Sequence, residues 1–132
     1  MTRPFNLDTD YPMLCEWWTK HKTPLLPSAV FIPAIGLVAK GAMGFLFVPE
    51  KTEGGIGIVE FVTTNPDASP KERLSGWNAV MSGLEAIAIE KGCGSLMSFV
   101  AQGKSEEHML SKTGWLDVTG TPHLIFGKVL CR

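Results

Sequence analysis

The stretch TTNPDASPKERLSGWNAVMSGLEA, Thr63–Ala86, contains the junction that decides the fold. It follows the apolar run IGIVEFV and leads into apolar residues at helical spacing, so it connects a strand to a helix. Such a junction commonly binds a phosphate group through the free N–H groups of the first helical turn. Here Ser69 and Glu72 form a capping box around Pro70, which predicts a helix that begins at Pro70.

The patterning on either side of this junction predicts the remaining elements. Helical spacing is found in residues 10–22, where Asp8 or Asp10 can act as the N-cap, in the long segment from Pro70 to Gly92, and in a short segment after Ser105. Strand patterns cover residues 3–7, 35–39, 42–48, 56–64, 95–101, 115–119 and 123–130. The order β-α-β-β-β-α-β-α-β-β predicts an α/β (α+β) fold, one domain over residues 1–132, with a mixed central sheet of about six to seven strands flanked by helices.

Composition excludes several classes of function. Of the 132 residues 45% are hydrophobic and 19% are charged, and the net charge of -1 gives no basic footprint for nucleic acid. No segment has the order of a secretory signal, and three widely spaced cysteines without a CxxC pair favour reduced thiols in the cytoplasm and no metal site.

The segment Ala29–Val48 is apolar over about the length of a membrane span. Lys40 and Gly41 interrupt it at the middle, and a central lysine costs about 3 kcal/mol in a bilayer. We therefore expect two short strands joined by a Lys40–Gly41 hairpin turn, and no membrane association.

The predicted order of elements resembles the GNAT superfamily of acyl-CoA-dependent N-acetyltransferases, as do two local segments. Residues 109–115, MLSKTGW, resemble the Leu-Tyr-Glu-Lys-x-Gly-Phe segment at the end of the family's last helix. The second segment, from IVEFVTTNP to CGSL, resembles the family's strand, pyrophosphate loop, long helix and next strand. The resemblance implies a GNAT-like fold, acetyl-CoA as donor and an amine of a small molecule or protein as acceptor.

The same resemblance places a cofactor site at the junction. Family members carry Arg/Gln-x-x-Gly-x-Gly/Ala there, and the nearest match is Arg73-Leu74-Ser75-Gly76-Trp77-Asn78, in which Asn78 replaces the last small residue. If the helix begins late, near Arg73, then Val62, Thr63, Lys71, Arg73 and Gly76 would bind CoA. If the capping box forms, Pro70 has no N–H group to donate and the Glu72 carboxylate occupies the N-cap. The backbone N–H groups that would bind the pyrophosphate are then lost as a site. Gly76 could then serve close helix–sheet packing.

Two residues are candidates for the transfer chemistry that the resemblance implies. Glu60 is a carboxylate within the apolar run IVEFV, at the family's general-base position. If Glu60 is half-buried, desolvation raises its pKa toward a useful value; alternatively it faces solvent or forms an ion pair. Leu110 stands where the family has the Tyr that acts as general acid. His108 lies nearby and is either a substitute general acid or a surface residue. Either Trp17 or Trp18 could contact the acceptor.

Two classes of function remain open on these grounds. The chain is an N-acetyltransferase, or it is an inactive binding or regulatory module that kept the fold and lost CoA. The two closing strands could also pair in a homodimer.

Overall fold

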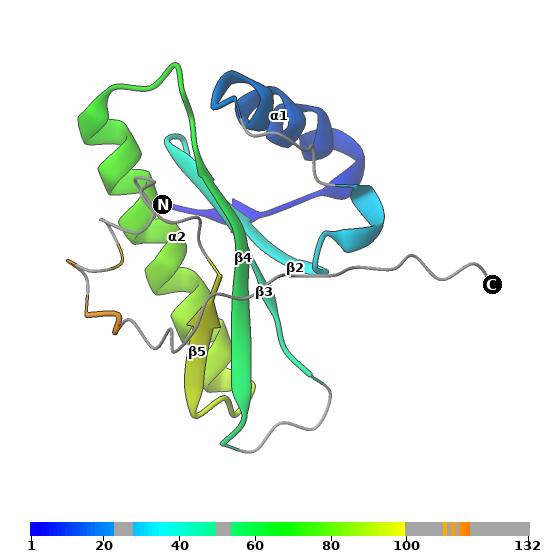
Figure 1. Cartoon of the computed structure of the whole chain (residues 1–132), viewed down its shortest axis with the longest axis vertical. Helices are drawn as coiled ribbons and strands as arrows, with labels where there is room; N and C mark the ends of the chain where they lie inside the picture. The colour runs from blue at the N-terminus through cyan, green and yellow to red at the C-terminus, as the bar shows by residue number, and fades with distance from the viewer. Residues whose placement is uncertain (23–27, 50–53, 100–109, 111, 113, 117–132) are drawn as a thin grey trace. The chain divides into compact units, whose positions relative to one another are not determined.

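The computed structural model describes residues 1–22, 28–49, 54–99, 110, 112 and 114–116, and Figure 1 draws the whole chain. Residues 1–98 form one compact unit and residues 99–132 a second, and the elements below belong to the first. Most of the predicted short helix, the last two predicted strands and His108 lie outside the described residues.

The first unit is built on a five-stranded mixed sheet with the strand order β1-β2-β3-β4-β5. Its strands are β1 (Arg3–Pro4), β2 (Ile35–Val38), β3 (Ala42–Phe47), β4 (Ile56–Thr64) and β5 (Ser95–Ser98). Neighbouring strands are antiparallel except β4 and β5, which are parallel because α2 (Pro70–Glu90) connects them. The predicted mixed sheet is thus confirmed, with five strands in the described residues where about six to seven were predicted.

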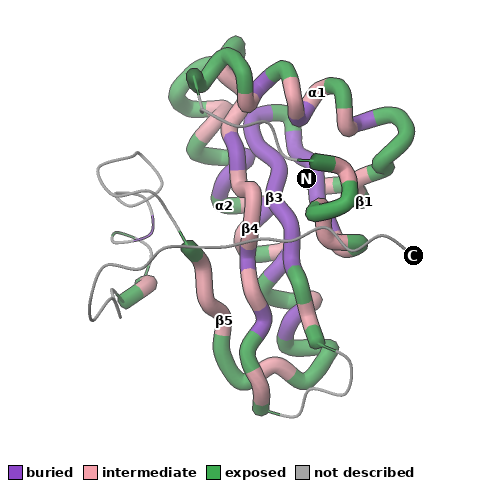
Figure 2. The backbone as a smooth tube through the Cα atoms, turned by 45° about the vertical axis from the view of Figure 1, so that its right-hand side comes forward, coloured by how far each residue is buried: buried purple, intermediate pink, exposed green. Residues whose placement is uncertain are grey.

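Two helices cover opposite faces of the sheet, as Figures 1 and 2 show. On one face Leu14 and Trp17 of α1 (Leu7–Lys20) form a buried cluster with Met43 and Phe45 of β3. On the other face α2 lies so close to β3 that a Cβ atom at Gly44 would be 3.0 Å from Val80. The core therefore has two layers, one on each side of β3.

The hairpin predicted at Lys40–Gly41 is confirmed. Residues Ile35–Val38 pair with Met43–Leu46, and the Ala39 amide donates a hydrogen bond to the Ala42 carbonyl at 2.8 Å. The apolar segment considered as a membrane span thus contains two strands and the 3-10 turn η1 (Ala29–Phe31). No helix in the described ranges combines the length and apolarity needed to cross a membrane.

The predicted cap of α1 was wrong. Asn6 is the N-cap, and its side chain accepts hydrogen bonds from the amides of Asp8 and Thr9. Asp10 is buried and instead accepts two hydrogen bonds from the Arg3 guanidinium, at 2.7 and 2.8 Å, and one from the Asn6 amide. Arg3 thereby lowers the pKa of Asp10. This ion pair ties β1 to α1.

A β-bulge interrupts β4 beside Glu60. Phe45 pairs with Glu60 but Met43 pairs with Thr63, so β4 has one more residue than β3 between these pairs. Phe61, within the bulge, has a φ of 50°, which is unusual for a bulky residue. Its ring lies against Phe45 and Trp18 on the α1 side, whereas Val62 faces α2. In a regular strand Phe61 and Glu60 would lie on opposite faces, and the bulge places both on the α1 face.

The N-terminal half of α2 lies against the Lys40–Gly41 turn with no side chain between the two backbones. A Cβ atom at Gly76 would be 2.8 Å from the Ala42 nitrogen and 2.9 Å from Gly41 carbon atoms. Since both sides of this contact are backbone, neither can move aside as a side-chain tip does. The predicted alternative for Gly76, close helix–sheet packing, is thus what the structure shows.

We expect Gly76→Ala to lower the free energy of unfolding by about 1–3 kcal/mol, even though alanine favours helices by about 1 kcal/mol over glycine. Gly83→Ala is the matched control on the same helix, because the nearest atom that its Cβ would meet is the tip of a side chain, Leu37 Cδ1, and not backbone. Urea unfolding of both variants measures the difference. Equal stability of the two variants would contradict the backbone contact.

We expect Asp10→Asn to lower the free energy of unfolding by about 1–3 kcal/mol at pH 7. Because the folded-state pKa of Asp10 is lowered, the ion pair stabilises the fold above the unfolded pKa of about 3.9 and is lost as the pH falls through the folded value. The difference in the free energy of unfolding between wild type and variant should therefore become smaller below about pH 4. Denaturant titrations from pH 7 to pH 2.5 measure it, with exposed Asp8→Asn as the control; a gap that does not depend on pH would contradict this account.

Candidate functional site

Glu60 lies on an apolar surface at the β4 bulge. Its side chain is half-buried, and burial raises its pKa above the ordinary value. Phe45 is its cross-strand partner and Phe61 follows it, while no hydrogen bond or ion pair joins its carboxylate to another described residue. The structure thus agrees with the half-buried alternative predicted for Glu60. A carboxylate with a raised pKa can accept a proton near neutral pH.

The pairing of β4 with β5 ends beside Glu60. The last pair is Val59–Ser98, where the Ser98 hydroxyl also donates to the Val59 carbonyl at 3.0 Å, while β4 continues to Thr64. In the part of the chain that the structure describes, no strand pairs with Glu60–Thr64 on the β5 side. An extended ligand can add to such an edge through backbone hydrogen bonds. Thr63 is buried and Val62 half-buried, so they would take part mainly through their backbone.

The backbone amides of the junction after β4 are almost all occupied. Six amides between Asn65 and Arg73 donate to acceptors of the chain at 2.9–3.2 Å, namely those of Asn65, Asp67, Ala68, Ser69, Glu72 and Arg73. Pro66 and Pro70 have no N–H group. Among the described contacts this leaves the Lys71 amide alone without an acceptor. A diphosphate needs several convergent donors, and this junction does not present them.

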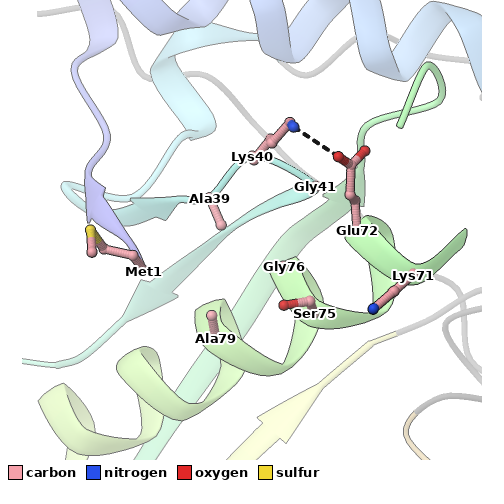
Figure 3. Close-up of a pocket in the computed structure, with 9 residues that line it drawn as sticks. All are labelled: Met1, Ala39, Lys40, Gly41, Lys71, Glu72, Ser75, Gly76 and Ala79. Carbon is pink, nitrogen blue, oxygen red and sulfur yellow. Dashed lines mark ion pairs between the residues drawn. The ribbon is translucent and has the colours of Figure 1, made fainter. Parts of the chain in front are cut away.

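The capping box predicted from the sequence is present. The Ser69 hydroxyl accepts from the Glu72 amide at 3.2 Å, and the Glu72 carboxylate accepts from the Ser69 amide at 3.1 Å. The helix begins at Pro70, so the predicted alternative of a start near Arg73 is wrong. The Glu72 carboxylate also forms an ion pair with Lys40, whose Nζ lies 2.7 Å from Oε1, and Lys40 lowers the pKa of Glu72. A negative charge therefore stands at the start of α2, as Figure 3 shows.

Two further contacts tie the junction to the end of α1. Lys20 forms an ion pair with Asp67 at 2.7 Å, and the His21 Nε2 lies 2.8 Å from the Thr64 carbonyl oxygen. On the hairpin side, the Gly41 carbonyl accepts the Asn65 amide at 2.9 Å. The junction is thus held by α1 on one side and by the hairpin turn on the other.

The residues predicted to bind a cofactor do not converge. Lys71 is exposed, Arg73 is half-exposed, and Gly76 is buried against the hairpin turn. Lys71 and Arg73 are two positions apart on α2, and side chains at that spacing do not face each other on a helix. Sequence reasoning missed Lys40, Lys20 and His21, because each reaches the junction from a distant segment.

Two cavities lined by described residues of the first unit lie away from Glu60. One of about 330 Å³ adjoins the start of α2 and is lined in part by Lys40, Glu72 and Ser75, which Figure 3 labels. A second, of about 410 Å³, lies between α1 and the hairpin turn and is lined in part by Trp17 and Asn65. The candidate site is therefore an open strand edge beside Glu60.

The chain is similar in fold to solved structures that include acetyltransferases. Ribosomal-protein-alanine N-acetyltransferase from Brucella melitensis biovar Abortus 2308 is 15% identical, with 96% of this chain and 99% of that chain covered and a TM-score of 0.65. A Mycobacterium tuberculosis protein crystallised with CoA and NLQ is 16% identical, with coverages of 94% and 76% and a TM-score of 0.69. AAC(6')-Iy, solved with the bisubstrate analogue CoA-S-monomethyl-acetylneamine, is 14% identical, with coverages of 99% and 98% and a TM-score of 0.61.

These likenesses show that the chain has the fold of the GNAT acetyltransferases, as the sequence resemblance implied. No protein-family model matches the chain, and no curated protein does. The residues present fit the pantetheine arm of a CoA thioester better than they fit its diphosphate. The open edge of β4 suits the extended pantetheine arm. The occupied junction amides do not suit the diphosphate.

We expect Ser69→Ala to lower the free energy of unfolding by about 1 kcal/mol, since it leaves the Glu72 amide without its cap. Ser75→Ala, an exposed serine inside α2, is the matched control and should change stability little. Chemical denaturation of the two variants makes the comparison. A larger loss at Ser75 than at Ser69 would show that the capping box does not form in solution.

Proposed function

We propose that the chain is an N-acyltransferase that transfers an acetyl group from a CoA-type thioester to an amine, with Glu60 as the general base. The observation that carries the proposal is the half-buried carboxyl of Glu60, with its raised pKa, where β4 and β5 part. The fold shared with acetyltransferases supports the same class of reaction.

Glu60 has the properties that amide formation demands of a base. An amine attacks only in its neutral form, so it must lose a proton, and Glu60 accepts that proton directly or through a water molecule. When bound, the thioester supplies an activated acyl carbon: the new C–N bond forms as the C–S bond breaks, and the departing sulfur takes a proton from solvent. The backbone of Val62 and Thr63 would hold the pantetheine arm along the open edge of β4.

The acceptor would approach Glu60 from the α1 side of the sheet. Trp17 is buried in the core, whereas Trp18 is half-buried with its ring centroid 5.8 Å from that of Phe61. Trp18 and Phe61 therefore give the acceptor site an aromatic wall on the same face as Glu60. Such a wall suits an amine carried on an apolar or aromatic group.

A second function has one specific observation in its favour. The closed capping box is what a binding or regulatory module that has lost CoA would show. Such a module would bind no acyl-CoA and catalyse no transfer, and Glu60 would have no chemical role in it. Calorimetric titration with acetyl-CoA separates the two functions, because absence of heat at millimolar ligand would favour the module.

We expect Glu60→Gln to lower the rate of amine acetylation by about 10²–10⁴-fold. In the wild type the rate should fall as the pH drops through the raised pKa of Glu60, because the protonated carboxyl accepts no proton. A glutamine side chain cannot titrate, so this limb of the profile should disappear in the variant. Thiol release from acetyl-CoA over a panel of small amines and peptide N-termini provides the measurement. Full activity of Glu60→Gln, with the acid limb intact, would remove Glu60 from the reaction.

A further inference from the structure

We infer that the thioester donor is recognised by its acyl-pantetheine arm and not by its diphosphate, an inference that rests on the proposed function. The amides that a diphosphate would need are occupied by the chain itself from Asn65 to Arg73, apart from that of Lys71. The open edge of β4, by contrast, has no competing strand in the described residues. The two ends of a CoA donor thus meet very different surfaces.

The charges at the junction also disfavour a bound diphosphate. Glu72 places a carboxylate over the N-cap, and Asp67 adds a second carboxylate in the connecting loop. The cations nearest to them are already engaged, Lys40 with Glu72 and Lys20 with Asp67, both at 2.7 Å. A diphosphate at the N-cap would therefore meet two carboxylates whose nearest cations are already paired.

Two cations at the start of α2 have no ion pair in the described residues. Lys71 and Arg73 point away from each other because they are two positions apart on one helix, so they cannot close on the same diphosphate. Gly76 cannot offer its backbone either, since the Gly41–Ala42 backbone already lies against it. The groups left without a partner at the described junction, the Lys71 amide and the side chains of Lys71 and Arg73, therefore do not form a convergent set of donors for a diphosphate.

The donor class that fits is an acyl-pantetheine thioester. Its two sources are a free acyl-CoA, whose nucleotide would extend into solvent, and a pantetheine arm attached to a carrier protein. Both present the same extended amide arm to β4. The two amides of that arm can exchange hydrogen bonds with a strand edge as a neighbouring strand does.

Binding measurements test this without an acceptor amine. We expect pantetheine and CoA to bind the wild-type chain with dissociation constants within about threefold of each other, and adenosine 3′,5′-diphosphate not to bind. An engaged diphosphate would instead favour CoA by more than about tenfold, since one charge-assisted hydrogen bond contributes about that much. Preference for CoA above tenfold would overturn the inference.

Glu72→Gln sharpens the test, because glutamine still serves a capping box but carries no charge. We expect this variant to bind CoA severalfold more tightly and pantetheine with unchanged affinity. Glu85→Gln, an exposed glutamate farther along α2, is the matched control and should change neither. An equal gain for both ligands in Glu72→Gln would contradict the role of the charge.

The arms of the experiment separate this inference from the proposed function. If pantetheine and CoA bind equally but no amine is acetylated from either thioester, the proposed function fails and the donor preference stands. If CoA binds much more tightly and acetylation occurs, the function stands and this inference fails. Faster transfer from a carrier-bound arm than from acetyl-CoA would identify the carrier as the source.

Discussion

The direct contact between the backbone of α2 at Gly76 and the Lys40–Gly41 turn determines how the functional end of the sheet is built. With no side chain between helix and turn, the first turn of α2 is held beside the hairpin. From there Glu72 reaches Lys40 and the Asn65 amide reaches the Gly41 carbonyl. The junction becomes a corner whose polar groups satisfy one another.

The sequence predicted the elements whose signals are local. Pro70 and Ser69 fixed the start of α2, Lys40–Gly41 fixed the hairpin turn, and the alternating run gave β4 its bounds. The N-cap of α1 was predicted wrongly because three residues of equal capping propensity stand close together, and only the contact of Asp10 with Arg3 decides between them. The bulge at Phe61 has no local signal at all. A positive φ is unfavourable for phenylalanine, so it is held by the packing of that ring against Trp18 and Phe45, which no alternation pattern contains.

The candidate site also has features with a local sequence signal and features that depend on residues far apart in the chain. Glu60 could be found because it is a carboxylate inside the apolar run IVEFV of a predicted strand, and its half-burial follows from that setting. The capping box, which occupies some of the junction amides, also has a local sequence signal. The remaining contacts depend on groups far away in the chain: Asn65 and Lys40 are 25 residues apart, and Lys20 and Asp67 are 47 apart. Such contacts follow from the fold rather than from spacing, so sequence reasoning could pose the two alternatives for Lys71 and Arg73 but could not decide between them.

The reacting end and the nucleotide end of the site depend on different contacts. The bulge that carries Glu60 is held by ring packing against α1, whereas the junction amides are occupied mainly by Asn65, Ser69 and Glu72 of the junction itself. Binding energy from a remote group such as a diphosphate helps to hold the reacting atoms in place, so a site that lacks it must rely on contacts nearer the reaction. In the proposed reaction those contacts would be the edge of β4 that is unpaired in the described residues and the aromatic wall of Trp18 and Phe61. Selectivity should then reside in the acyl arm and the acceptor amine, the two parts of the reaction that meet at Glu60.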